Sequence, residues 1–401
     1  MKMSATLKSQ VIVKQRKKAG LPVYNFGLGA NPLPISEAFS KELEKHLDKK
    51  NYVSACGVDE FQNVIKKTYS NDKYKAAHVL TSNGLKEMLF LVQMAFKGLI
   101  IHITPSWISY KEQIHILNKS ADLIELETKL EDNYKINLTE LEKILSWIPK
   151  TTKKLMIFNN PNNPTGVVHT PEEVEEIAKV LDKYNVIVFS DEIYANLAYI
   201  PTVSISKYIP HLTIRGSSVS KDLGCGGYRL GWATFPDELT WLFAECHRLS
   251  SSIYSCTTVP IQYATANLLE NDVDMNYICK NTKSIFSFII RDICECIENS
   301  CCKDMIRYVP TQSAWYLFLN FDKYKDKLSK RGINTSGGLH EFLLNTYGIV
   351  TVAGKHFNIG GLNLRFSLVD LTKSENGELE IDFGKNMREG FRLLLDYFGN
   401  L

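Results

Sequence analysis

Short runs of apolar, often β-branched residues alternate with helical patterns through the middle of the chain, and this alternation constrains the fold most strongly. The runs cover residues 77–81, 99–103, 155–158 and 186–189. Continuous apolar runs of this length are typical of strands that are buried on both faces of a sheet. The pattern therefore predicts an α/β fold with a mostly parallel sheet and helices on both of its faces.

Helix signals fill the spaces between these runs. Residues 85–92 have a helical pattern, and Thr170-Pro171-Glu172-Glu173 predicts a helix start in which Thr170 caps and Glu173 closes a capping box. That helix is expected to end near Lys183. A further long helical pattern covers residues 275–297.

The 401 residues are enough for two or three domains of typical length. We predict a large domain over residues 50–298 and a smaller α+β domain built from residues 1–49 and 299–401. No repeat, low-complexity tract or long Pro/Gly/Ser-rich linker interrupts the chain.

Composition excludes several classes of protein. The formal net charge of +3 gives no reason to expect a nucleic-acid partner. Because no run of 18 apolar residues occurs, no membrane span is expected. The start of the chain has no signal-peptide pattern, and nine cysteines favour a reducing, cytoplasmic location. Cys294, Cys296, Cys301 and Cys302 lack paired zinc-ligand spacing, so we expect no metal.

Polar groups follow the apolar runs, where ligands bind in parallel α/β sheets. In chain order the segments are Gly84-Leu85-Lys86, Pro105-Ser106-Trp107, Asn159–Gly166, Asp191-Glu192-Ile193-Tyr194 and Ser217–Arg229. A turn at a helix start can bind phosphate, and a Trp can stack on an aromatic ring. Taken singly, each segment also fits a plain role: an ordinary helix start, a core Trp, a turn, a solvated carboxylate or a surface loop.

Together these segments resemble the fold-type-I, pyridoxal-phosphate-dependent aminotransferases of the class I/II group. The resemblance extends from about residue 25 to about residue 369. It depends on Asn163-Pro164-Thr165-Gly166, on Asp191 with Tyr194, and on Ser218 with Lys221 and an arginine eight residues further on. It implies a three-layer αβα fold and pyridoxal 5′-phosphate (PLP) as cofactor.

The resemblance implies roles for residues around the cofactor ring. Lys221 matches the lysine that joins the cofactor aldehyde and later acts as general base. Asp191 matches the carboxylate that faces the pyridine nitrogen. Tyr194 and Asn163 match the groups that hydrogen-bond the ring oxygen, and Trp107 matches the stacking residue.

Further matches concern the phosphate and the substrate. Ser218, Arg229 and the backbone of Gly84-Leu85-Lys86 match the phosphate-binding cup. Arg365 matches the arginine that binds the substrate α-carboxylate, and Asn163 is also expected to bind the substrate. Gly29 matches a glycine near that carboxylate.

Tyr52 matches a tyrosine that reaches the phosphate of a neighbouring subunit, so the resemblance implies a homodimer with shared active sites. The implied reaction is transfer of an amino group from an L-amino acid to a 2-oxo acid by a ping-pong mechanism. The sequence contains no signal for a second arginine that would bind a dicarboxylic substrate.

Two alternatives stay open. Asp191-Glu192-Ile193-Tyr194 and Ser220-Lys221-Asp222-Leu223-Gly224 are also similar to segments of aminocyclopropane-carboxylate synthases, so a PLP-dependent cyclase or a C–S lyase is the second hypothesis. A catalytically silent, ligand-sensing or scaffold homologue is the third, although Lys221 and Asp191 are both present.

Overall fold

The computed structural model describes residues 5–374, 376 and 378–401, and the chain forms two compact units. The smaller unit consists of Met1–Pro32, Asn163–Gly166 and Ser284–Leu401, and the larger consists of Leu33–Asn162 and Val167–Lys283. These units do not follow the predicted domain boundaries residue for residue. The boundaries at residues 50 and 298 therefore stay a prediction.

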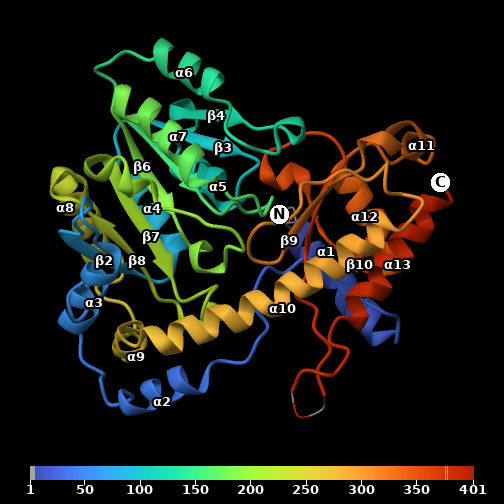
Figure 1. Cartoon of the computed structure of the whole chain (residues 1–401), viewed down its shortest axis with the longest axis horizontal. Helices are drawn as coiled ribbons and strands as arrows, with labels where there is room; N and C mark the ends of the chain where they lie inside the picture. Colours follow the sequence, from blue (N-terminus) through green and yellow to red (C-terminus); the bar gives the residue numbers. More distant parts are fainter. Residues whose placement is uncertain (1–4, 375, 377) are drawn as a thin grey trace. The chain divides into compact units, whose positions relative to one another are not determined.

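A seven-stranded sheet forms the centre of the larger unit, in the order β2-β8-β7-β6-β5-β3-β4 (Figure 1). Its strands are β2 (His78–Ser82), β3 (Leu99–Thr104), β4 (Leu123–Glu127), β5 (Lys154–Asn159), β6 (Val186–Asp191), β7 (Thr213–Ser218) and β8 (Gly231–Phe235). β4, β3, β5, β6 and β7 run parallel, and β8 is antiparallel to both of its neighbours. The expected mostly parallel sheet is confirmed.

The strands are buried as their apolar runs predict. Every residue of β5 and β6 is buried. Along β2, Val79 packs with a core cluster that includes α3 and α9 residues, whereas the next residue, Leu80, packs with the cluster that includes α4. Because successive side chains of a strand point to opposite faces, this sheet has helices on both sides.

Helices connect and cover these strands in the larger unit. They are α2 (Glu37–Lys45), α3 (Asp59–Tyr69), α4 (Leu85–Ala95), α5 (Ser109–Ile116), α6 (Leu138–Trp147), α7 (Pro171–Lys183), α8 (Thr240–Ile253) and α9 (Val259–Glu270). The predicted capping box is confirmed, because Thr170 Oγ1 accepts from Glu173 N and Glu173 Oε2 accepts from Thr170 N. The long predicted helix is α10 (Asp272–Glu298), which contributes residues to both units.

The smaller unit has a three-stranded antiparallel sheet in the order β11-β12-β9 and a two-stranded pair, β1-β10. The strands are β1 (Tyr24–Asn25), β9 (Tyr316–Asn320), β10 (Ile349–Val350), β11 (Val352–Ala353) and β12 (Asn363–Ser367). The helices are α1 (Ala5–Lys18), α11 (Lys325–Ser329), α12 (Ser336–Tyr347) and α13 (Lys385–Gly399). Phe26, Phe366 and Phe391 form an aromatic cluster in its core, with ring centroids 5.1–5.5 Å apart.

Candidate active site

Asp191 lies at the carboxyl end of β6 and is held by several neighbours. Its Oδ2 accepts a hydrogen bond from the Tyr110 hydroxyl at 2.6 Å, and its Oδ1 accepts from Ile193 N at 3.2 Å. Asn159, at the end of neighbouring β5, donates to the Asp191 carbonyl oxygen at 3.1 Å. Asn159 therefore holds the Asp191 backbone, and Tyr110 and Ile193 hold its carboxylate, at the edge of the sheet where parallel α/β folds bind ligands.

Burial dominates the acidity of Asp191. Only 3% of the residue is exposed, and burial raises the pKa of its carboxyl from 3.8 to about 6. Hydrogen bonds from Tyr110 and Ile193 lower this pKa, Glu192 raises it and the Lys221 charge lowers it. A nearby cation, such as a protonated ring nitrogen, would favour the ionised carboxylate further.

Lys221 and Tyr194 lie in the loops that follow β7 and β6. The Lys221 ammonium is 5.6 Å from the centroid of the Tyr194 ring, and Tyr194 is buried. Lys221 also acts electrostatically on the Asp191 carboxyl. The larger unit thus places the three residues predicted to be catalytic in one neighbourhood.

The turn before α4 packs against Arg229. Gly84 has a φ of +86°, and Arg229 donates from Nη2 to Asn83 O at 2.6 Å and from Nη1 to Gly226 O at 2.7 Å. A Cβ on Gly84 would lie 2.5 Å from Arg229 Nη2. The helix start and the guanidinium therefore meet only because residue 84 has no side chain. Leu85 and Ser218, also predicted to lie here, are both buried, and Ser218 ends β7.

Lys86 lies over Trp107. The Lys86 ammonium is 5.0 Å from the centroid of the indole ring, which is within the range of a cation–π contact. Partial burial lowers the pKa of Lys86, and the charges of Arg229 and Lys221 lower it further. Lys86, Lys221 and Arg229 thus form a cluster of cations around the predicted cofactor residues.

Arg365 and Asn163 lie in the smaller unit and contact each other. Arg365 is buried in β12 and donates from Nη1 to Asn163 Oδ1 at 2.9 Å and from Nη2 to Gly27 O at 3.0 Å. Its guanidinium carbon is 4.6 Å from the centroid of the Tyr316 ring and 5.1 Å from that of Phe357. These contacts hold the guanidinium plane in one orientation, as recognition of a carboxylate requires.

Gly29 leaves room for one of these rings. A Cβ on Gly29 would lie 2.4 Å from the Tyr316 hydroxyl, which donates to Gly29 O at 3.3 Å. Tyr316 is the first residue of β9. Its contact with Arg365 is a feature that the sequence did not reveal.

The predicted site residues are therefore divided between the two units, and Tyr52 differs from the others because its side chain is highly exposed. Asp191, Tyr194, Lys221, Trp107 and the Gly84–Arg229 pair belong to the larger unit, and Arg365, Asn163 and Gly29 belong to the smaller. Tyr52, in the larger unit, is 89% exposed. Tyr110 was missed by the sequence reasoning, although its position three residues after Trp107 at a helix start was an available signal.

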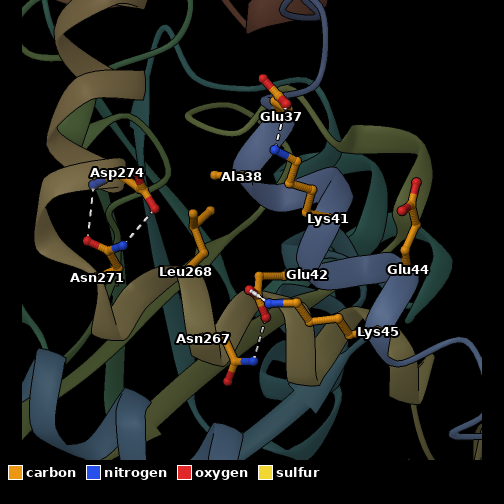
Figure 2. A pocket seen from close by; sticks show the side chains of 10 residues that line it. All are labelled: Glu37, Ala38, Lys41, Glu42, Glu44, Lys45, Asn267, Leu268, Asn271 and Asp274. Carbon is orange, nitrogen blue, oxygen red and sulfur yellow. Dashed lines mark hydrogen bonds and ion pairs between the residues drawn. The ribbon is translucent and has the colours of Figure 1, made fainter.

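A surface pocket of about 760 Å³ lies between α2 and the end of α9 (Figure 2). Figure 2 shows that several of its polar side chains bond to one another: Lys41 pairs with Glu37, Lys45 pairs with Glu42, and Asn267 donates to Glu42. None of the predicted site residues is among those that line it. The pocket is therefore not part of the candidate active site.

The described part of the chain has neither a metal-binding cluster nor a membrane-spanning helix. No group of three or more His, Cys, Asp or Glu residues there could hold a metal ion. No helix among these same residues is long and apolar enough to cross a membrane.

Comparisons with known proteins agree with this geometry. The sequence profile of the family "Aminotransferase class I and II" matches residues 19–379. A probable aspartate/prephenate aminotransferase from Aquifex aeolicus is 27% identical over 387 residues, which are 92% of each chain. Thermotoga maritima aspartate aminotransferase has a solved structure that is 25% identical, with a TM-score of 0.79 over 99% of this chain and 97% of that one.

A double mutant of Thermus thermophilus aspartate aminotransferase is 20% identical and has a TM-score of 0.82, over 99% of this chain and 97% of that one, and it supports the fold alone. These findings do not favour the cyclase or lyase alternative. The chain belongs to the class I and II aminotransferase family and is a PLP-dependent aminotransferase that acts on small-molecule substrates.

Proposed function

We propose that the amino donor is an acidic L-amino acid, with L-aspartate the first candidate, and that the acceptor is a 2-oxo acid. The observation that carries this proposal is Lys86. Its side chain is exposed and lies over the Trp107 ring, with the ammonium 5.0 Å from the ring centroid, and no ion pair joins it to a carboxylate among the described residues. Desolvation and the charges of Arg229 and Lys221 lower the pKa of Lys86, so an anionic ligand bound beside it would stabilise its charged form.

Each of the three clustered cations, Lys86, Lys221 and Arg229, can be assigned a role. Arg229 lies at the start of α4, where a phosphate is favoured, and Lys221 is the amine for the cofactor aldehyde. Lys86 is then available for the second carboxylate of a dicarboxylic substrate. Relatives named aspartate aminotransferase support the same assignment.

The residues present fit PLP. The turn at Gly84 admits no Cβ, because the Arg229 guanidinium occupies that space, and a Cβ on Gly231 would lie 2.4 Å from Leu85 N. No side chain from residue 84 or 231 stands against the start of α4, whose first N–H groups have no partner within the helix and can bind a phosphate. Asp191 supplies a buried carboxylate for the ring nitrogen. When bound, PLP supplies an electron-withdrawing ring that stabilises a carbanion at the substrate Cα.

We assign the protein's own groups as follows. Arg365, held by Asn163, binds the substrate α-carboxylate and orients the Cα–H bond. Lys221 Nζ accepts the Cα proton, and Asp191 holds the proton on the ring nitrogen. Tyr194 and Asn163 would hold the cofactor through the ring oxygen, Trp107 would hold it through the ring, and Ser218 and Arg229 would hold it through the phosphate. Because the amino group stays with the enzyme between release of the first 2-oxo acid and binding of the second, the mechanism is ping-pong.

We further propose a homodimer in the cytoplasm. A tyrosine that is 89% exposed, as Tyr52 is, is available to reach the phosphate of a second copy. None of the nine cysteines, all of which lie in the described residues, forms a disulfide, as expected in a reducing compartment. Sedimentation at two protein concentrations tests the dimer.

The substrate proposal is tested with Lys86→Met. Loss of a charge-assisted contact to the second carboxylate should lower kcat/KM for L-aspartate by about 10- to 100-fold. The value for L-alanine, which has no second carboxylate, should stay within a few-fold. Lys67→Met, which removes an exposed lysine of α3, is the control. An equal loss for both amino acids would contradict the assignment.

The enzyme assignment has its own test. Lys221→Ala should keep the fold, measured by circular dichroism, and should abolish amino transfer from every donor. Turnover at the normal rate in this variant would show that another group is the base.

A further inference from the structure

The Asp191 carboxylate is fixed by a tyrosine that the sequence patterns did not single out. Tyr110 is 2% exposed, and its hydroxyl lies 2.6 Å from Asp191 Oδ2. The other carboxylate oxygen accepts from the backbone of its own turn, at Ile193 N. One carboxylate oxygen is therefore held by the backbone of its own turn, and the other is held by a side chain from helix α5.

The helix that carries Tyr110 also contacts two other parts of the cofactor neighbourhood. Trp107 lies two residues before the start of α5, and its ring meets the Tyr110 ring edge-on, with centroids 5.6 Å apart. One turn after Tyr110, Gln113 Nε2 donates to Lys86 O in the first turn of α4, at 2.7 Å. A single short helix thus connects the predicted stacking residue, the carboxylate and the helix start that is predicted to bind phosphate.

Buried amides fix α5 on its inner side. Gln93 Nε2 donates to Gln113 Oε1 at 2.7 Å, and His102 Nε2 lies 3.2 Å from Gln93 Oε1. Burial lowers the pKa of His102 to about 3, so the ring is neutral and can donate to that oxygen from Nε2. Because Gln93, His102 and Gln113 are all buried, this chain of hydrogen bonds resists displacement of the helix.

The hydroxyl of Tyr110 favours the ionised state of Asp191. Burial and the neighbouring carboxylate raise the pKa of Tyr110 well above 10, so the hydroxyl stays protonated and donates. The other charged groups that act on Asp191 are Glu192, which is bound to Arg215 at 2.8 Å, and Lys221. Donation to an ionised carboxylate stabilises that form against burial.

We propose that Tyr110 is a positioning residue of the aminotransferase: its hydroxyl holds the Asp191 carboxylate ionised and in one orientation, and α5 places it relative to Trp107 and Lys86. The proposal depends on the proposed role of Asp191 at the ring nitrogen. Tyr110 acts on the cofactor through Asp191, so its effect should disappear when Asp191 can no longer be ionised.

The test is a double-mutant cycle read by cofactor affinity. The dissociation constant of PLP is measured by titrating the apoenzyme between pH 5 and 8.5, for the wild type, Tyr110→Phe, Asp191→Asn and the double variant. Tyr110→Phe should weaken PLP binding about 10- to 100-fold near pH 6.5. The pH at which affinity falls should also move upward, because the carboxyl loses a donor that lowers its pKa.

A matched control separates this effect from loss of a buried hydroxyl in general. Tyr74 is fully buried in the same unit, and its hydroxyl donates to Thr234 O at 3.0 Å. Tyr74→Phe should lower the thermal midpoint to a similar extent as Tyr110→Phe, with PLP affinity within about twofold of the wild type.

The outcomes are distinct. In the Asp191→Asn background, Tyr110→Phe should change PLP affinity less than twofold. If it weakens binding equally in both backgrounds, or does not change it in the wild type, Tyr110 has no positioning role. If Asp191→Asn itself leaves PLP affinity and turnover unchanged, the role of Asp191 fails, and the proposal for Tyr110 fails with it.

Discussion

Replacing Arg365 by lysine tests the carboxylate site most directly, because the charge is kept and only the planar fork is lost. In the native protein the guanidinium is held by Asn163 Oδ1 and Gly27 O, at 2.9 and 3.0 Å, and it stacks against Tyr316. Its plane is therefore fixed before substrate binds. A lysine ammonium has no plane to fix, so it can provide a charge but not two parallel donors.

The magnitude follows from the hydrogen bonds that the substitution removes. An arginine that binds a carboxylate through two charge-assisted hydrogen bonds would lose one of them on replacement by lysine, which is about 1.5–3 kcal/mol. At 1.36 kcal/mol for each factor of ten, Arg365→Lys should lower kcat/KM by about 10- to 150-fold. Arg365→Leu should lower it further, because the charge is also removed.

The assay is the first half-reaction under single-turnover conditions, followed by the change in cofactor absorbance in a stopped-flow instrument. An amino acid is compared with the primary amine that lacks its α-carboxylate. Arg365→Lys should slow the reaction of the amino acid and leave the slow reaction of the amine unchanged. If both slow by the same factor, Arg365 supports the fold or the cofactor and does not recognise the carboxylate.

Three further predictions concern acidity, backbone and helix capping. Because burial raises the pKa of Asp191 to about 6, PLP affinity should be constant above pH 6 and fall about tenfold per pH unit below it. The apoenzyme should instead lose stability as the pH rises from 3.8 through 6, because the folded state keeps the proton that the unfolded state has released. A flat binding profile from pH 5 to 8 would contradict this prediction. In Gly84→Ala an alanine must adopt a φ of +86°, at a cost of about 1–2 kcal/mol, and its Cβ displaces Arg229, so PLP affinity should fall. The control is Gly227→Ala, whose Cβ meets nothing within 4 Å and which should leave PLP affinity unchanged. Thr170→Ala removes the cap of α7 and should lower the free energy of unfolding by about 1 kcal/mol, seen as a lower urea midpoint with unchanged PLP affinity.

Local patterns in the sequence predicted the elements of the larger unit well. The apolar runs became β2, β3, β5 and β6, and the Thr170–Glu173 signature became the capping box of α7. These features depend on residues that are close in sequence, so propensity and periodicity decide them. The positions of the site residues just after strands also follow from the chain order, since parallel strands end at one edge of the sheet.

Contacts between residues that are far apart in the sequence could not be predicted from local sequence patterns. Tyr110 and Asp191 are 81 residues apart, and Arg365 and Asn163 are 202 apart, so no local pattern encodes either pair. The left-handed backbone of Arg229, with a φ of +57°, is likewise unusual for a residue other than glycine, and it accompanies the packing of the guanidinium against Gly84.

The sequence by itself determined which strands and helices form and which chemical groups follow them, because those properties depend on neighbouring residues. Only the tertiary structure decided the acidity of Asp191 and the orientation of Arg365. Both depend on burial and on hydrogen-bond partners that other elements bring, namely Tyr110 from α5 and Asn163 from the loop after β5.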